Sequence, residues 1–328
     1  MRKLRVGLLM GGPSAEHEVS LASGEVVGKA LGSGNKYEVI PILIGRDGTW
    51  PIEIEDLADE IDVAFIALHG EYGEDGTVQE ILKNQGIPFT GSDVLPSALA
   101  MNKVLSLRLL ASKGIPVPRF VVVHNHEKEI EPFDHFGFPV VVKPANRGSS
   151  VGVAVVRTPE GLYSSLQNAF RFSRDALIQE YIPGHEVTCS VLDDGLGDVI
   201  PLPVTEIIPK SGGFFDYKAK YTPGASEEIT PARLTDEGTE LIQRTAVAAH
   251  RALGASGFSR TDMVIGEDGE LYVFEVNTIP GMTETSLLPQ AAEAHGLTLE
   301  DLFDRIIEAG LRRHGILLRN LSYNPTGI

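Results

Sequence analysis

The first hundred residues alternate short, continuously apolar runs with stretches whose apolar residues have helical spacing. Apolar strands that alternate with helices are typical of a parallel sheet covered on both faces. We therefore expect a Rossmann-like α/β domain over residues 1–97, with ligands beyond the carboxyl ends of its strands. The expected strands are 5–10, 37–44 and 61–68, and the expected helices are 20–31 and 77–85.

The pattern changes after the segment 114–119, which has the composition of a linker. Strand-length apolar runs here surround a single amphipathic helix, which favours a small α+β domain over residues 98–184. Pro183 and Gly184 are expected to form a hinge at its end. The expected strands are 120–123, 140–143, 152–156 and 177–181, and the expected helix is 159–170.

The third segment, residues 185–313, mixes strands, a long loop and two helices. The loop at 210–231 has no clear period, and loops of that length are usually lids or disordered segments. Thr235 is a good N-cap, and Thr298 with Asp301 has the spacing of a capping box. Residues 314–328 have no strong pattern and are expected to be a tail. The expected strands are 186–192, 199–208, 263–265 and 271–276, and the expected helices are 234–253 and 298–313.

Composition narrows the functional classes. The 328 residues are 42% hydrophobic and 22% charged, as in an ordinary globular protein. The formal net charge of −17 argues against nucleic-acid or acidic-membrane binding, which requires a basic surface. No apolar run approaches the length of a membrane span. The one cysteine, Cys189, is expected to be a small buried hydrophobe, and the lack of a disulfide framework fits a cytoplasmic location.

Three polar side chains of the hairpin expected within 258–288 are placed to share a ligand. Glu275 and Asn277 alternate on one strand and therefore point the same way. Asp262 lies on the partner strand, across from Glu275 or one register away. Two carboxylates and an amide oxygen suit Mg²⁺ better than Zn²⁺. The alternative is an ordinary solvated face of a half-buried sheet.

The stretch 140–152 is a candidate phosphate site. Lys143 ends a run of three valines, and the following loop is rich in glycine and serine, which expose backbone N–H groups to an anion. The Gly-Lys-Ser/Thr ending of a Walker loop is absent. A glycine-rich hairpin with a surface lysine is the alternative. A second lysine, Lys103, begins the helix that leads into this domain and is otherwise a solvated charge.

Four further features have a structural and a functional interpretation. The passage 179–186 is either an interdomain linker or a holder for a purine edge and a ribose. Glu16 either stabilises the helix that follows it or meets an ammonium group. Arg260 lies beside the possible metal site, where a cation stabilises developing negative charge. His69 ends an apolar strand and is expected to be hydrogen-bonded structure first and a ligand second.

Taken in order, seven motifs of the chain resemble those of the D-alanine–D-alanine ligases, which are ATP-grasp enzymes. The resemblance extends from about residue 4 to residue 312. One such motif would carry little weight, but seven in the same order are specific. The motifs are Gly-Gly-x-Ser-Ala-Glu-x-Glu-Val-Ser (11–20), His-Gly-x-x-Gly-Glu-Asp-Gly-Thr (69–77), Met-Asn-Lys (101–103), Val-Lys-Pro-x-x-x-Gly-Ser-Ser-Val-Gly (142–152), Asp-Tyr-x-Ala-Lys-Tyr (216–221), Ser-Arg-Thr-Asp (259–262) and Glu-Val-Asn-Thr-x-Pro-Gly-Met-Thr (275–283).

The resemblance implies a three-domain ATP-grasp fold with ATP held between the second and third domains. It implies a ligase that phosphorylates the carboxylate of one D-alanine with ATP and lets the amine of a second D-alanine attack the acyl phosphate. The product would be the D-alanyl-D-alanine of peptidoglycan precursors. The implied cofactors are ATP and Mg²⁺ or Mn²⁺, with two ions per site, and family members are commonly homodimers.

The resemblance also implies roles for individual residues. The metal ligands would be Asp262, Glu275 and Asn277. The nucleotide site would include Lys103, Lys143, Gln179, Glu180, Ile182, Glu186 and Lys220. The substrates would be held by Glu16, His69, Arg260, the Gly281 N–H, Ser286 and the Leu287 N–H. The catalytic set would be Glu16, Ser149, Tyr221, Arg260 and Gly281, with Lys220 and Tyr221 on a lid at 210–231 that excludes water.

One departure and one retained feature bear on specificity. Where the family usually has glutamate, Gln179 stands before the hinge with Glu180 next, so either residue could read adenine. Tyr221 keeps the lid pattern of enzymes that use an amine, so we expect attack by an amine over a hydroxyl. Two alternatives stay open: a relative that makes D-alanyl-D-lactate or another ATP-grasp product, and a non-catalytic ATP-binding module.

Overall fold

The computed structural model describes residues 2–125, 137–148, 151–209 and 226–316. A parallel sheet lies at the amino-terminal end, in the order β2 (Tyr37–Ile44), β1 (Leu4–Gly11), β3 (Val63–Ile66). Val6 pairs with Val39 on one side and with Val63 on the other. All four residues of β3 are buried, as a strand covered on both faces requires. The predicted Rossmann-like arrangement is therefore confirmed.

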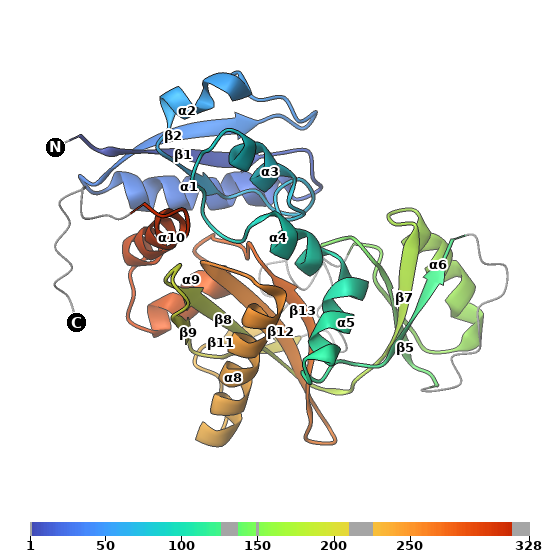
Figure 1. Ribbon diagram of the computed structural model, residues 1–328. Coiled ribbons are helices and arrows are strands. Elements are labelled where there is room, and N and C mark those ends of the chain that lie inside the picture. Colours follow the sequence, from blue (N-terminus) through green and yellow to red (C-terminus); the bar gives the residue numbers. More distant parts are fainter. Residues whose placement is uncertain (1, 126–136, 149–150, 210–225, 317–328) are drawn as a thin grey trace.

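Helices from both ends of the chain cover this sheet. In Figure 1, α1 (His17–Gly32) and α10 (Leu299–Arg313) lie on one side of it, and α2 (Leu57–Glu60) lies on the other. Phe303 of α10 meets Phe65 of β3 edge-on, with 5.7 Å between the ring centroids. The last helix of the chain thus packs into the first hydrophobic core. The smaller elements here are η1 (Ile54–Asp56) and α3 (Thr77–Asn84).

The second sheet is antiparallel and belongs to the central part of the chain. Its order is β4 (Phe120–His124), β7 (Asp175–Glu180), β5 (Val140–Pro144), β6 (Ala154–Val156). One face is covered by α6 (Leu162–Phe170), which follows the short η2 (Pro159–Gly161). β7 pairs with strands on both sides, so Gln179, its second-last residue, is held from two directions.

The third sheet carries the hairpin. Its order is β11 (Ser226–Ile229), β10 (Thr205–Pro209), β8 (Gly184–Asp193), β12 (Phe258–Gly266), β13 (Leu271–Asn277), and β9 (Val199–Pro201) pairs with β8. One core joins this sheet to α8 (Asp236–Leu253) and to residues of α4 (Val94–Met101) and α5 (Lys103–Ser112). Figure 1 shows α5 running between the second and third sheets. Its other face packs on the second sheet through Val104 and Leu107.

The N-caps predicted for two helices are confirmed. The Thr235 hydroxyl accepts a hydrogen bond from the N–H of Gly238 at the start of α8. Thr298 and Asp301 form the expected capping box of α10.

Cys189 is buried, and burial raises the pKa of its thiol to about 12, so it behaves as a small hydrophobe.

Two expectations about strands were wrong. The single strand expected at 199–208 is broken into β9 and β10, because Pro201 and Pro203 have no N–H groups to continue a ladder. The end of the expected loop at 210–231 is strand β11, which pairs with β10. Residues 210–225 of that loop lie outside the described part of the chain.

Two helices were missed because each carries a proline as its third residue. Pro96 lies in the first turn of α4, and Pro289 lies in the first turn of α9 (Leu287–Ala294). A proline is tolerated there because the first N–H groups of a helix have no intrahelical acceptor. Among the described residues, no single helix is long and apolar enough to cross a membrane, although α4 and α5 together, bent by 100°, have that length and composition.

Candidate active site

The hairpin of β12 and β13 brings the three predicted metal ligands together. Asp262 pairs directly with Glu275, and Arg260 pairs with Asn277. The Asp262 carboxylate is 3% exposed and accepts two hydrogen bonds from the Arg260 guanidinium, at 2.7 and 2.9 Å. It also accepts from the Thr188 hydroxyl at 2.7 Å and from Asn277 Nδ2 at 3.1 Å. A buried carboxylate held by four donors is fixed in position.

Lys103 links this hairpin to the glycine-rich loop. Its Nζ donates to Glu275 Oε1 at 2.7 Å and to the carbonyl oxygen of Arg147 at 2.7 Å. The pair is largely shielded, since the side chains of Lys103 and Glu275 are 9% and 17% exposed. Lys103 begins α5 as expected, but it is a buried ion-pair partner rather than a solvated charge.

The donor set at the hairpin fits a hard divalent cation. Asp262, Glu275 and Asn277 offer oxygen atoms from two paired strands, which is the chemistry Mg²⁺ and Mn²⁺ prefer. Arg260 and Lys103 supply the balancing positive charge in this structure. Within the described residues, no group of three or more His, Cys, Asp or Glu side chains is arranged to hold a metal. An ion here would therefore depend on the amide of Asn277 and on oxygen atoms that the protein does not supply.

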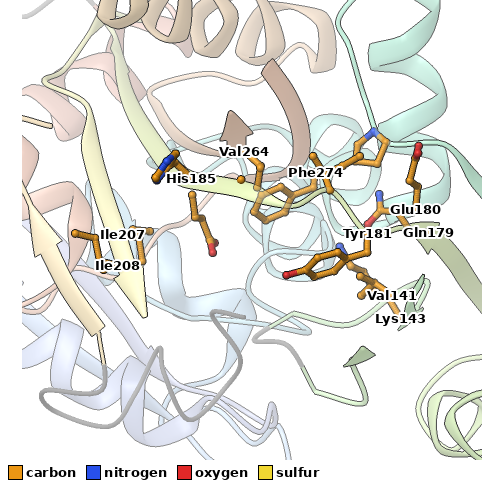
Figure 2. Close-up of a pocket in the computed structure, with 14 residues that line it drawn as sticks. Val141, Lys143, Gln179, Glu180, Tyr181, His185, Ile207, Ile208, Val264 and Phe274 are labelled. Carbon is orange, nitrogen blue, oxygen red and sulfur yellow. The ribbon is translucent and has the colours of Figure 1, made fainter. Parts of the chain in front are cut away.

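A pocket opens between the second and third sheets. Figure 2 shows Gln179, Glu180, Tyr181 and Lys143 gathered at one end of it, with Ile207 and Ile208 at the other. The Lys143 ammonium lies over the ring of Phe274, 5.3 Å from its centroid. The lining surface is mostly apolar and carries several polar groups, as in sites for small molecules and cofactors. It consists of Pro118, Val141, Lys143, Gln179, Glu180, Tyr181, Ile182, Gly184, His185, Glu186, Ile207, Ile208, Val264 and Phe274.

Two neighbours at the end of β7 have different surroundings. Gln179 is 2% exposed and lines the pocket. The Glu180 carboxylate is engaged by Arg119 through two hydrogen bonds, at 2.9 and 2.6 Å. The Arg119 guanidinium also lowers the pKa of Glu180 and keeps it ionised.

Glu16 lies where three loops meet. Its Oε1 would be 3.1 Å from a Cβ atom at Gly70 and 3.0 Å from one at Gly148. Any side chain at these glycines would press on the carboxylate. An ion pair of Arg147 with Glu71 joins the same two loops. Glu16 thus connects the amino-terminal segment to the loop that follows Lys143.

His69 is buried, and both of its ring nitrogens are engaged. Burial lowers the pKa of His69, so the ring is neutral. Nδ1 lies 3.1 Å from the carbonyl oxygen of Ile279, which can only accept, so Nδ1 carries the proton. Nε2 then accepts from the Ser23 hydroxyl at 2.8 Å, and Ser23 Oγ accepts from the Met282 N–H at 3.2 Å. Ser23 and His69 therefore clamp the turn that contains Gly281.

Gly281 faces the start of α9. A Cβ atom at this position would lie 2.8 Å from Ser286 Oγ, so a larger residue would displace the Ser286 side chain. Ser286 Oγ accepts from the Thr283 N–H at 3.1 Å and lies 2.7 Å from Thr283 Oγ1. Ser286 is the N-cap of α9, and Leu287 is its first residue. Gly281 therefore lies beside the N-cap of α9.

Three predicted residues lie outside the described part of the chain: Ser149, Lys220 and Tyr221. Their places in the site stay predictions.

Sequence reasoning missed Glu74 and Ser23. Glu74 Oε1 accepts from the Gly70 N–H at 2.8 Å, and its side chain is 14% exposed. Burial, and after it the charge of Glu16, raises the pKa of Glu74 well above its ordinary value. Glu74 stands in the motif 69–77, so its position was available from the sequence. Ser23 lies inside a helix and has no local signal.

The raised pKa of Glu74 predicts a pH-dependent stability. The folded state holds the proton more tightly than the unfolded state, so this stabilisation is complete below the ordinary glutamate pKa and is lost as pH rises through the folded value. Glu74→Gln keeps a neutral side chain at every pH. We expect its unfolding free energy, relative to wild type, to increase from about pH 5 to about pH 8.

Urea unfolding with a chelator present measures this difference. The control is Glu80→Gln, an exposed glutamate on α3, which should follow the wild-type curve. A constant difference between Glu74→Gln and wild type across that pH range would contradict the assignment.

Comparisons with known proteins agree with this geometry. The sequence model described as D-ala D-ala ligase C-terminus matches residues 109–308, and the one described as D-ala D-ala ligase N-terminus matches residues 5–60 and 52–92. The chain is 47% identical over 309 residues to a D-alanine–D-alanine ligase of Geobacter sulfurreducens, covering 94% of each. The chain belongs to the D-alanine–D-alanine ligase family.

Solved structures of this family and its relatives have the same fold. The crystal structure of D-alanine–D-alanine ligase from Bacillus anthracis complexed with ATP matches with a TM-score of 0.81 and 38% identity, covering 95% of this chain and 99% of that one. The VanG D-Ala:D-Ser ligase from Enterococcus faecalis matches with a TM-score of 0.83 and 34% identity, covering 94% and 100%. The predicted ATP-grasp fold is confirmed, and the chain is an ATP-dependent ligase that forms D-alanyl-D-alanine for peptidoglycan synthesis.

Proposed function

We propose that this D-alanine–D-alanine ligase phosphorylates the carboxylate of one D-alanine and joins the resulting acyl phosphate to the amine of a second. The proposal rests on one observation above all. The carboxylates of Asp262 and Glu275 lie on paired strands β12 and β13 and are bound by the cations Arg260 and Lys103. The same two strands contribute Val264 and Phe274 to the wall of the pocket.

The nucleotide would be held by side chains from the second sheet, the third sheet and α5. Lys143 and Lys103 would contact its phosphates, and Glu186 at the pocket wall would accept from the ribose. Asp262, Glu275 and Asn277 would hold Mg²⁺ or Mn²⁺. When bound, these ions neutralise the phosphate charge and polarise the group being transferred.

The first D-alanine would present its ammonium to Glu16, where the loops at 11–20, 69–76 and 145–148 meet. Arg260 and the Gly281 N–H would bind the oxygen that becomes negative when the amine attacks. Ser286 and the Leu287 N–H would bind the carboxylate of the second D-alanine at the start of α9, where the helix dipole favours an anion. Ser149, Lys220 and Tyr221 are proposed to complete the site from the loop and the lid.

We also propose domain boundaries, an oligomeric state and a cellular location. The three sheets support domains at 1–97, 98–184 and 185–313 with a tail at 314–328, although α5 and α10 pack across these boundaries. A homodimer and a cytoplasmic location are proposed from the family resemblance.

A substrate panel tests the function. Phosphate release from ATP and Mg²⁺ is measured with D-alanine alone, and with D-alanine plus D-lactate, D-serine or L-alanine. We expect release with D-alanine alone and D-alanyl-D-alanine as the product. Release that requires D-lactate or D-serine would instead assign a different acceptor, D-serine being the acceptor named for the VanG relative. ATP binding without any D-alanine-dependent release would contradict the proposal.

Breaking the clamp that Ser23 and His69 form on the Gly281 turn should affect both stability and turnover. Ser23→Ala removes the donor to His69 and the acceptor of the Met282 N–H, leaving both buried and unpaired. We expect a loss of about 1–3 kcal/mol in unfolding free energy. We also expect kcat to fall about tenfold while the KM for ATP changes little, because the turn lies at the proposed oxyanion site and not at the nucleotide pocket.

Steady-state kinetics at saturating D-alanine separates the two effects. The control is Ser33→Ala, the exposed C-cap of the same helix, which should leave kcat unchanged. Equal losses of ATP affinity and turnover in Ser23→Ala would mean that Ser23 only maintains the fold.

A further inference from the structure

Gln179 has an unpaired amide inside the nucleotide pocket. The side chain is 2% exposed and lines the pocket at the end of β7. Among the described residues, its Nε2 has no hydrogen-bond partner. A buried N–H group without an acceptor is costly, and a ligand in this pocket that accepts from it would remove that cost.

The strand holds this amide in place. β7 is hydrogen-bonded on both sides, and Gln179 pairs with Phe120 of β4 and with Val141 of β5. The backbone at Gln179 therefore cannot shift without disturbing two ladders. On the terminal amide, no described side chain or backbone group accepts from Nε2, so this donor is available to a ligand. The amide can present either its oxygen or its nitrogen to a ligand.

Glu180 is unsuited to the same role. Its carboxylate is occupied by both arms of the Arg119 guanidinium, at 2.9 and 2.6 Å. Successive side chains of a strand point to opposite faces, so Gln179 and Glu180 point away from each other. Gln179 is left as the side-chain amide at this end of the pocket (Figure 2).

We propose that Gln179 contacts position 6 of the purine and that its amide makes the pocket more tolerant of 6-oxopurine nucleoside triphosphates than a carboxylate would. The inference rests on the proposed use of this pocket for the nucleotide. An ionised carboxylate accepts from the 6-amino group of adenine but repels the 6-oxo group of hypoxanthine. An amide accepts from the first through its oxygen and donates to the second through its nitrogen.

Other contacts with the base contribute discrimination of their own. Residues 180–182 line the same pocket, and their identity is unchanged by a substitution at position 179. Only the share of the discrimination that Gln179 contributes should change in a variant. The quantity to compare between wild type and variant is the affinity for the adenine nucleotide divided by the affinity for the hypoxanthine nucleotide.

Calorimetric titration with non-hydrolysable triphosphates of adenosine and inosine measures this ratio, with kcat/KM for ATP and ITP as a second readout. We expect Gln179→Glu to raise the preference for the adenine nucleotide by about tenfold or more, through weaker binding of the inosine nucleotide. The matched control is Gln167→Glu, an exposed glutamine on α6, which should keep the wild-type ratio. An unchanged ratio in Gln179→Glu would overturn the proposal.

Gln179→Met provides an independent test if a buried glutamate prevents folding. Methionine has a similar shape but neither donates nor accepts a strong hydrogen bond. Both analogues should then bind more weakly by similar factors. A loss confined to the adenosine analogue would mean that Gln179 only accepts, which would also overturn the proposal. These binding results stand apart from the activity: absence of D-alanine-dependent phosphate release in wild type would refute the proposed function without deciding which base the pocket prefers.

Discussion

Glu275→Gln is expected to abolish D-alanine-dependent turnover while leaving the fold intact. The amide still accepts a hydrogen bond from Lys103, whose Nζ lies 2.7 Å from Glu275 Oε1, so the packing of the hairpin is preserved. The negative charge that would hold a divalent cation is lost. A metal ion contributes several kcal/mol to phosphoryl transfer, so kcat should fall by about 10³-fold or more.

Phosphate release under saturating ATP and D-alanine measures this loss, with circular dichroism and thermal unfolding as checks on folding. The control is Glu270→Gln, an exposed glutamate in the turn of the same hairpin, which should be as active as wild type. Addition of Mn²⁺ at high concentration tests the cause, since a weakened site should recover part of its activity. Near-normal turnover in Glu275→Gln would refute the metal assignment.

Arg260→Ala is expected to depress turnover far more than nucleotide affinity. The Arg260 guanidinium is 12% exposed and is fixed by two hydrogen bonds to Asp262, so it is oriented before substrate binds. A preorganised donor at a developing oxyanion is worth about 10²–10³ in kcat. Arg260→Lys keeps the charge but loses the planar fork, so its kcat should be intermediate.

Nucleotide affinity is measured directly by calorimetry and turnover by phosphate release. Arg244→Ala, which removes an exposed arginine paired with Glu240 on α8, should change neither. A variant at position 260 that binds nucleotide poorly but turns over normally at saturation would count against the oxyanion role. Because Arg260 also neutralises Asp262, Arg260→Ala can lose some nucleotide affinity as well. A modest loss of nucleotide affinity alongside a large loss of turnover is therefore consistent with the oxyanion role.

Sequence reasoning succeeded where local patterns determine structure. The parallel pairing of β1, β2 and β3 follows from apolar strands alternating with helices. The hairpin follows from a turn-rich segment between two strands, and its register places Asp262 opposite Glu275 as one of two expected arrangements. The capping box of α10 is likewise a local signal.

Long-range packing could not be predicted in the same way. Nothing in residues 299–313 indicates that Phe303 packs against Phe65, because a helical pattern reveals an apolar face but not its partner. The clamp of Ser23 and His69 on the Gly281 turn joins residues that are distant in the chain. The bidentate pairing of Arg119 with Glu180 is also invisible in the sequence, although it distinguishes two adjacent polar residues that the sequence left equivalent.

The central claim is that the carboxylate of one D-alanine attacks the γ-phosphoryl group of ATP at the β12–β13 hairpin. Labelling both carboxylate oxygens of D-alanine with oxygen-18 tests it most directly. The carboxylate oxygen that becomes bonded to phosphorus leaves with it when the amine displaces phosphate. Each phosphate released should therefore carry one oxygen-18 atom, and one dipeptide should form for each phosphate released. Phosphate that carries oxygen only from ATP and water would contradict this claim.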